Sequence, residues 1–215
     1  MIDRLYFISQ QNTEDSHMTS IRRALDAGCR LIQLRVKNQS PESMLDQAFQ
    51  ARLLCTAYGA CFMINDFPEI ARTTGADGVH LGFHDPSLLA ASTFLGSDFI
   101  IGGTANTYED ILQRVAEGAD YISVGPFRFT TTKQNLSPII GLEGYRIMMA
   151  KLRADGIETP IIAVGGILAD DVPELLEAGV YGFAFSGTIT RSENPAATVG
   201  QIQQAITNYL IPTTL

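Results

Sequence analysis

The chain has 215 residues, of which 46% are hydrophobic and 18% charged, and its formal net charge is −8. This length suits one sizeable core, since single α/β barrels run to roughly 200–250 residues. The acidic balance argues against a general affinity for nucleic acid or anionic membranes, so we expect no partner of either kind. The apolar run at residues 1–10 is too short for a signal peptide, and no segment approaches the roughly 20 apolar residues of a membrane span.

Short apolar runs alternate with longer amphipathic stretches along the whole chain. We expect strands at residues 4–9, 31–35, 61–64, 78–81, 99–103, 121–125, 161–165 and 182–186. Several of these runs are continuously apolar, as parallel strands buried on both faces should be. The stretches between them, such as 40–59 and 107–119, repeat apolar residues at helical spacing.

Local signals mark where the predicted helices begin and end. Ser40 precedes Pro41, a pattern typical of a helix N-cap followed by proline at the first helical position. A glycine falls where each of five helices should stop, shortly before the next strand: Gly28, Gly59, Gly75, Gly118 and Gly179. Eight even βα units predict an α/β protein with a (β/α)8 TIM barrel, one domain over residues 1–215. A doubly wound open sheet is the alternative.

The cysteine pattern bears on the cellular compartment. Cys29, Cys55 and Cys61 are an odd number, show no metal-like spacing, and each lies in an apolar or helical context. We therefore expect buried reduced thiols in a cytoplasmic protein.

In such a barrel the active site lies at the carboxyl ends of the strands. Gln33, Arg35 and Lys37 alternate at the end of the second strand, so their side chains should share one side. Arg and Lys suit a diphosphate, and Gln33, set among apolar residues, needs a polar partner. A solvated strand end is the alternative.

Two carboxylates follow neighbouring strands. Asp66 comes after Asn65 at the end of the third strand, and Asp85 follows the fourth. Mg²⁺ typically binds one or two carboxylates plus substrate phosphate oxygens, so the pair predicts a magnesium site. Each aspartate also suits the N-cap of the next helix. His80 and His84 lack a third ligand at a spacing that zinc requires.

Glycine-rich turns follow the last strands. Gly165 and Gly166 come after the seventh strand and are expected to open a helix, and Ser186 and Gly187 do so after the eighth. Such turns bind phosphate through backbone N–H groups, and these two loops are the common phosphate site of the barrel. After the fifth strand, Thr104 and Asn106 stand beside two glycines that would let backbone approach a ligand.

The segment GPFRFTTTK, residues 125–133, follows the sixth strand and combines three threonines with a lysine. Threonine-rich loops are common, but this one lies between the predicted phosphate site and the charged groups of the second to fourth strands. We interpret it as a phosphate clamp that reaches both.

These motifs, in this order over residues 33–189, resemble the thiamine phosphate synthase (thiamine-phosphate pyrophosphorylase) family of (β/α)8 enzymes. They are QLRVKN, ND, ADGVHLG followed by Asp85, GPFRFTTTK, GLEG, AVGGI and FAFSGTI. The resemblance implies a transferase of thiamine biosynthesis. It would join 4-amino-2-methyl-5-hydroxymethylpyrimidine diphosphate to 4-methyl-5-(2-hydroxyethyl)thiazole phosphate with Mg²⁺. Small-molecule substrates would then be its partners, and a homo-oligomer is compatible with the sequence.

The resemblance also implies a role for each matching residue. Gln33 would meet the pyrimidine, and Asp66 and Asp85 would bind Mg²⁺. The pyrimidine diphosphate would be held by Arg35, Lys37, Asn65 and Lys133, with the Thr104 hydroxyl near the leaving group. The thiazole phosphate would be received by Thr130, Thr132, Gly165, Gly166 and Ser186. Arg35, Thr104 and Lys133 would be the catalytic residues.

The implied chemistry needs no strong base, because the aminopyrimidine can expel diphosphate to leave a stabilised methylene cation that the thiazole nitrogen attacks.

The chain departs from the family at three positions, with Phe129 in place of Pro, Phe83 in place of Gln, and Asn106 in place of His. Two alternatives therefore stand beside the synthase. One is a thiazole tautomerase, although the loop at residues 125–133 has no His. The other is a binder that keeps the phosphate site without turnover.

Overall fold

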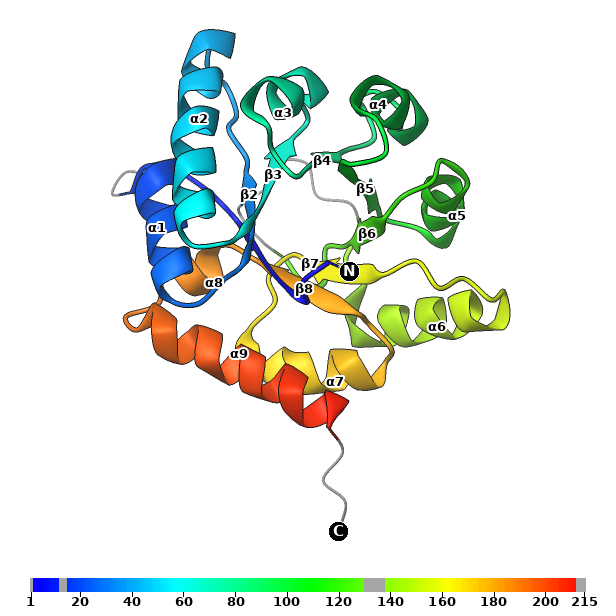
Figure 1. Ribbon diagram of the computed structural model, residues 1–215. Coiled ribbons are helices and arrows are strands. Elements are labelled where there is room, and N and C mark those ends of the chain that lie inside the picture. Colours follow the sequence, from blue (N-terminus) through cyan, green and yellow to red (C-terminus); the bar gives the residue numbers. More distant parts are fainter. Residues whose placement is uncertain (1, 12–14, 130–137, 212–215) are drawn as a thin grey trace.

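The computed structural model describes residues 2–11, 15–129 and 138–211, and these form a closed ring of strands surrounded by helices (Figure 1). The strands are β1 (Leu5–Ile8), β2 (Leu31–Leu34), β3 (Cys61–Asn65), β4 (Gly78–Leu81), β5 (Ile100–Ala105), β6 (Tyr121–Val124), β7 (Ile161–Val164) and β8 (Gly182–Phe185). Neighbours pair in parallel in chain order, and β8 pairs with β1. The predicted (β/α)8 barrel is confirmed, and the open-sheet alternative is wrong.

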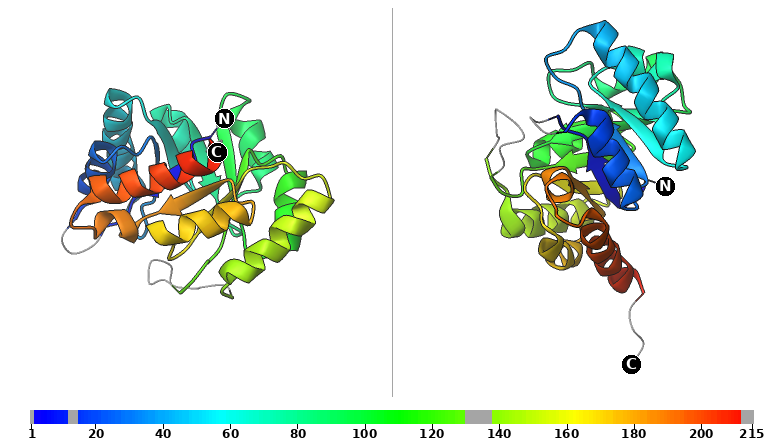
Figure 2. Two further views of the ribbon diagram at one scale, coloured as in Figure 1. Left: turned by 90° about the horizontal axis from the view of Figure 1, so that it is seen from below. Right: turned by 90° about the vertical axis from the view of Figure 1, so that its left-hand side faces the viewer.

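The helices follow the strands in turn. They are α1 (His17–Asp26), α2 (Pro41–Ala57), α3 (Pro68–Thr74), α4 (Leu88–Leu95), α5 (Tyr108–Ala116), α6 (Gly141–Ala154), the 3₁₀ turn η1 (Ala169–Asp171), α7 (Val172–Glu177), α8 (Gly187–Thr190) and α9 (Pro195–Leu210). Figure 2 shows α9 running along α7 on the outside of the barrel. In the described part of the chain, no helix combines the length and apolar character that a bilayer crossing requires.

The strand sequences explain why both faces are buried. Alternate residues point to opposite faces, so Phe7, Ile32 and Phe62 pack outward against the helices. Their neighbours form a separate buried cluster inside the barrel: Tyr6, Leu31, Met63, Tyr121, Ile162 and Ala184. The interior of the barrel is thus filled by side chains, as in other barrels of this kind.

Two of the predicted helix boundaries are confirmed by capping interactions at the helix ends. The Ser40 hydroxyl accepts a hydrogen bond from the backbone N–H of Ser43 at the start of α2. Gly75 ends α3 in the left-handed conformation, with φ of 63°, which glycine adopts without steric cost.

Most strand ends agree with the sequence prediction within one residue, but two boundaries near the site differ more. β5 continues to Ala105, so Thr104 lies within the strand and not after it. Gly165 and Gly166 do not open a helix directly, because η1 begins only at Ala169 and α7 at Val172. The turn after β7 is therefore longer than its glycines suggested.

The three cysteines are unpaired, with Cys29 and Cys55 buried and Cys61 half-buried. Burial raises the pKa of each thiol to about 12, so all three remain protonated at neutral pH. They are packing residues, as predicted for Cys29 and Cys55.

Candidate active site

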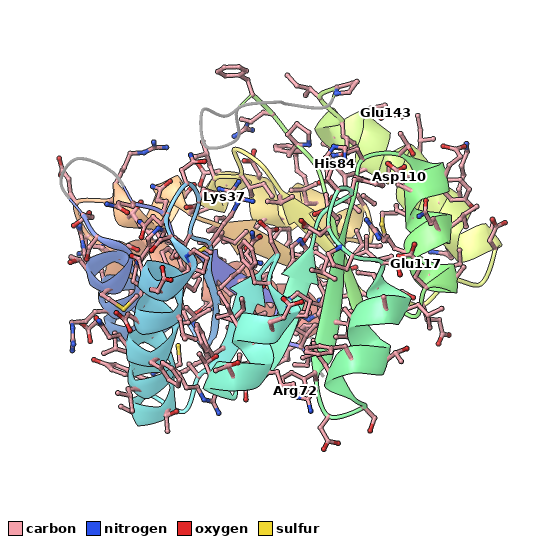
Figure 3. All side chains as sticks on the ribbon, turned by 90° about the horizontal axis from the view of Figure 1, so that it is seen from above. Lys37, Arg72, His84, Asp110, Glu117 and Glu143 are labelled. Atoms are coloured by element: carbon pink, nitrogen blue, oxygen red, sulfur yellow. The ribbon has the colours of Figure 1, made fainter. Side chains whose placement is uncertain are left out.

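Opposite charges cluster where β2, β3 and β4 end. The Lys37 ammonium contacts the Asp66 carboxylate, and the Asp66 and Asp85 carboxyl groups lie within hydrogen-bonding reach of each other. Asp66 is also close enough to Arg35 to act on the pKa of its guanidinium. Figure 3 shows Lys37 and His84 at one end of the molecule and Arg72 at the other. The charged residues predicted from three separate strand ends thus converge on one rim.

Neither aspartate caps a helix, so that alternative is wrong for both. Ser87 caps α4 through its side chain, and the N-cap position of α3 is Phe67, which makes no side-chain cap. Asp85 instead accepts a hydrogen bond of 2.6 Å from the Gly82 N–H, which points its carboxylate back to the end of β4.

The charged form of the Asp85 carboxyl is disfavoured. Burial raises its pKa above the usual range and the neighbouring Asp66 raises it further, while the Gly82 N–H and Lys37 act in the opposite direction. Asp66 itself has φ of 69°, in the left-handed region that few residues other than glycine adopt. Strain of this kind is found at functional sites, where binding chemistry compensates for it.

Replacing Asp85 by Asn should stabilise the metal-free protein. The amide oxygen can still accept from Gly82, whereas the desolvated charge facing Asp66 is removed. We expect the free energy of unfolding in EDTA to rise by about 0.5–1 kcal/mol, a size typical of relieving strain at a functional site. Urea unfolding of the parent and the variant measures this, and a clearly less stable variant would contradict the charge clash.

Polar side chains form a layer inside the barrel just below this rim. Gln33, Asn65 and His80 are 1%, 7% and 7% exposed, and Thr104 is half-buried beside them. Among the described residues, buried Asn65 Nδ2, Ser123 Oγ and Ser186 Oγ have no hydrogen-bond partner. Unpaired buried polar atoms are costly, so they suit a ligand that completes their bonds. Asn65 and Ser186 were predicted as ligand contacts, whereas Ser123 was not.

The two glycines of β5 serve packing rather than ligand approach, and that interpretation of them was wrong. A Cβ on Gly102 would lie 2.1 Å from the Tyr121 ring, and one on Gly103 would lie 2.9 Å from Leu88 and 3.0 Å from Arg114. Gly102 therefore makes room inside the barrel, and Gly103 makes room outside it.

The turn after β7 packs against the described start of the loop after β6. A Cβ on Gly165 would lie 2.7 Å from Pro126, and one on Gly166 would lie 2.5 Å from Arg128. Arg128 also binds the Gly166 carbonyl and forms a bidentate pair with Asp171, at 2.7 and 2.8 Å. The described start of the predicted clamp after β6 and the glycine turn after β7 are thus adjacent. Thr130, Thr132 and Lys133 lie outside the described residues.

Two of the three departures from the family pattern have structural roles. Phe83 stacks on the Arg114 guanidinium at 4.9 Å, and the Asn106 amide donates to the Gly125 carbonyl, joining the ends of β5 and β6. Phe129 is 68% exposed.

Arg114 is a buried charged residue, 3% exposed, that the sequence prediction missed. Its guanidinium donates to the Thr104 and Gly82 carbonyls and pairs with Glu117, which ties the ends of β4 and β5 together. The sequence did contain a signal for this role, because Arg114 is a charged residue on the apolar side of an amphipathic helix.

His17, which the sequence prediction also missed, supports the backbone of Arg35 through Ser9. Its Nδ1 lies 2.9 Å from the Ser9 hydroxyl, which accepts a hydrogen bond from the Arg35 backbone N–H. Burial, and then the Arg35 charge, lowers the pKa of His17 from 6.5 to about 4.

This pKa shift predicts a stability change in acid. Between pH 6.5 and about 4 the unfolded chain protonates His17 and the folded protein does not, so the free energy of unfolding should fall as the pH falls through this window. The slope is at most about 1.4 kcal/mol per pH unit. Urea unfolding at pH 7 and pH 5 should show a smaller drop for His17→Asn than for the parent. Equal drops would contradict the assignment.

The family comparison agrees with this geometry. Residues 5–189 match the family described as thiamine monophosphate synthase. The chain belongs to this family.

Members of the thiamine monophosphate synthase family resemble the chain over nearly its whole length. The thiamine-phosphate synthase of Bacteroides fragilis is 48% identical over 191 residues, covering 89% of this chain and 94% of that protein. That of Flavobacterium psychrophilum is 43% identical, with coverage of 96% and 100%. The solved structure of thiamine phosphate pyrophosphorylase from Pyrococcus furiosus superposes with a TM-score of 0.83 at 29% identity and covers 97% of each chain.

Proposed function

We propose that the protein is a thiamine-phosphate synthase, a transferase that condenses the aminopyrimidine diphosphate with the thiazole phosphate and releases pyrophosphate. The observation that carries the proposal is the convergence of Asp66 and Asp85 with Lys37 and Arg35 on one rim of a barrel of this family.

The residues present fit a Mg²⁺ ion. Mg²⁺ uses one or two protein carboxylates and takes its remaining ligands from waters and substrate phosphates. Asp66 and Asp85 supply two carboxylates in mutual reach, and the raised pKa of Asp85, caused first by burial and then by Asp66, supports a cation at this position. When bound, the ion would neutralise the charge that develops on the departing diphosphate.

The protein cations complete the anion site. Burial lowers the pKa of Arg35, so its charge is poorly solvated and favours an added anion. Lys37 is the counter-ion of Asp66 in the ligand-free protein, with 46% of its side chain exposed. We infer that Lys37 moves from Asp66 to a phosphate oxygen when the metal binds. Lys133 would act from the loop after β6.

The remaining residues hold and orient the two substrates. Asn65 Nδ2 is available to the diphosphate, and the Thr104 hydroxyl, 3.0 Å from His80 Nε2, would lie beside the leaving group. Ser186 Oγ and the turn at Gly165–Gly166 would receive the thiazole phosphate, together with Thr130 and Thr132. Holding both substrates in one site would convert a bimolecular reaction into an effectively unimolecular one. We assign no general base.

A product assay tests the proposal. With both substrates and Mg²⁺ the protein should release one pyrophosphate for each thiamine phosphate formed, and EDTA should abolish both. Incubation with thiazole carboxylate phosphate alone separates a tautomerase, which would convert it. Ligand binding without pyrophosphate release would identify a non-catalytic binder, and either outcome overturns the proposal. The unpaired thiols support a cytoplasmic location for the enzyme.

A further inference from the structure

A continuous chain of hydrogen bonds crosses the barrel interior from β2 to β5. The Gln33 side-chain nitrogen donates to the Tyr6 hydroxyl at 2.7 Å, and the Tyr6 and Tyr121 hydroxyls are 3.0 Å apart. The Tyr121 hydroxyl lies 3.0 Å from His80 Nδ1, and His80 Nε2 lies 3.0 Å from the Thr104 hydroxyl. One end is the predicted pyrimidine contact and the other is the hydroxyl beside the leaving diphosphate.

Packing fixes the middle of this chain. Gly102 leaves the space that the Tyr121 ring fills. The His80 ring stacks on Tyr121, with centroids 5.6 Å apart and planes 25° apart, and Tyr6 meets Tyr121 edge-on at 5.7 Å. Both tyrosines are 0% exposed, and burial raises their pKa values, so both hydroxyls keep their protons at working pH.

The chain can run in two directions, and Gln33 selects between them. Each hydroxyl has one proton to donate, and a neutral imidazole has one N–H. With the Gln33 nitrogen facing Tyr6, Tyr6 donates to Tyr121, and Tyr121 donates to His80 Nδ1. His80 then carries its proton on Nε2 and donates to Thr104. The Thr104 proton is thereby free to point at the diphosphate.

The opposite orientation of the Gln33 amide reverses every bond. The Gln33 oxygen would accept a hydrogen bond from the Tyr6 hydroxyl, and the Thr104 hydroxyl would donate its proton to His80 Nε2. An amino group on a bound pyrimidine would hold the observed orientation, because it would need the Gln33 oxygen as acceptor and leave the nitrogen for Tyr6.

We propose that Tyr121 and His80 are positioning residues that couple the Gln33 amide to the Thr104 hydroxyl, so that recognition of the aminopyrimidine keeps Thr104 as a donor for the leaving diphosphate. This inference rests on the proposed function for the identity of the two ligands. The direction of the hydrogen bonds is inferred from contacts between protein side chains and does not depend on which ligands bind.

A double-mutant cycle tests the coupling. Tyr121→Phe keeps the ring and its stacking but removes the hydroxyl, and kcat should fall about tenfold, with KM for the pyrimidine diphosphate within about twofold of the parent. In a Thr104→Val background the same change should have no further effect. Tyr145→Phe is the matched control, since this equally buried tyrosine bonds to the Val124 carbonyl outside the barrel, and kcat should stay unchanged. An equal loss in the Thr104→Val background would overturn the proposal.

The tautomer of His80 is a readout that requires no turnover. The chain has three histidines, so ring ¹⁵N resonances can be assigned with His17→Asn and His84→Gln variants. In the ligand-free protein at neutral pH, we expect a proton on Nε2 and none on Nδ1. A proton on Nδ1, or on both nitrogens, would overturn the inference even in an active synthase. An inactive protein with the expected tautomer would instead count against the proposed function.

Discussion

Replacing Asp66 by Asn is expected to lower kcat/KM about a thousandfold, because the several kcal/mol that a bound metal would supply to the transition state would be lost. Asn suits this test because it tolerates the left-handed conformation that Asp66 adopts, so the backbone can stay in place. Initial rates over a range of Mg²⁺ concentrations measure the effect, and raising Mg²⁺ should not restore the parent rate.

Asp46→Asn is the control for this change. Asp46 is exposed on α2, which lies on the outside of the barrel, and its loss of charge should leave the rate unchanged. An Asp66→Asn enzyme within tenfold of the parent would show that the carboxylate does not hold the metal.

Replacing Arg35 by Met is expected to lower kcat/KM about a hundredfold, the typical cost of removing one preorganised donor from a developing negative charge. The loss should appear with the pyrimidine diphosphate and should leave KM for the thiazole phosphate nearly unchanged. Steady-state kinetics with each substrate varied in turn separates the two.

Arg72→Met removes the same charge at the opposite end of the barrel (Figure 3). Arg72 is exposed in the last turn of α3, so this variant should keep parent kinetics. If both variants lost activity equally, net charge and not position would be responsible, and the assignment of Arg35 would be wrong.

The fold follows from local patterns in the sequence. Apolar strand runs, the Ser40 cap and helix-ending glycines such as Gly75 each act within a few residues, and each is visible without tertiary information. The boundaries that failed, at Thr104 and after Gly166, depend on pairing and packing between distant strands.

The charged part of the site was also predictable, because the barrel places every strand end on one rim. The positions of Asp66 and Asp85 predicted a metal-binding pair, with helix capping as the alternative, and the structure brings the two carboxyl groups together. By contrast, Tyr6 and Tyr121 look like core aromatics in the sequence. Their hydroxyls meet only because β1 and β6 face each other across the barrel, which no local pattern encodes.

A crystal structure with Mn²⁺ and pyrophosphate tests the metal and anion site most directly. We expect one anomalous-scattering peak bonded to a carboxylate oxygen of Asp66 and of Asp85, with pyrophosphate oxygens on the ion and against Arg35. A peak that contacts neither aspartate, with pyrophosphate bound elsewhere, would contradict this expectation.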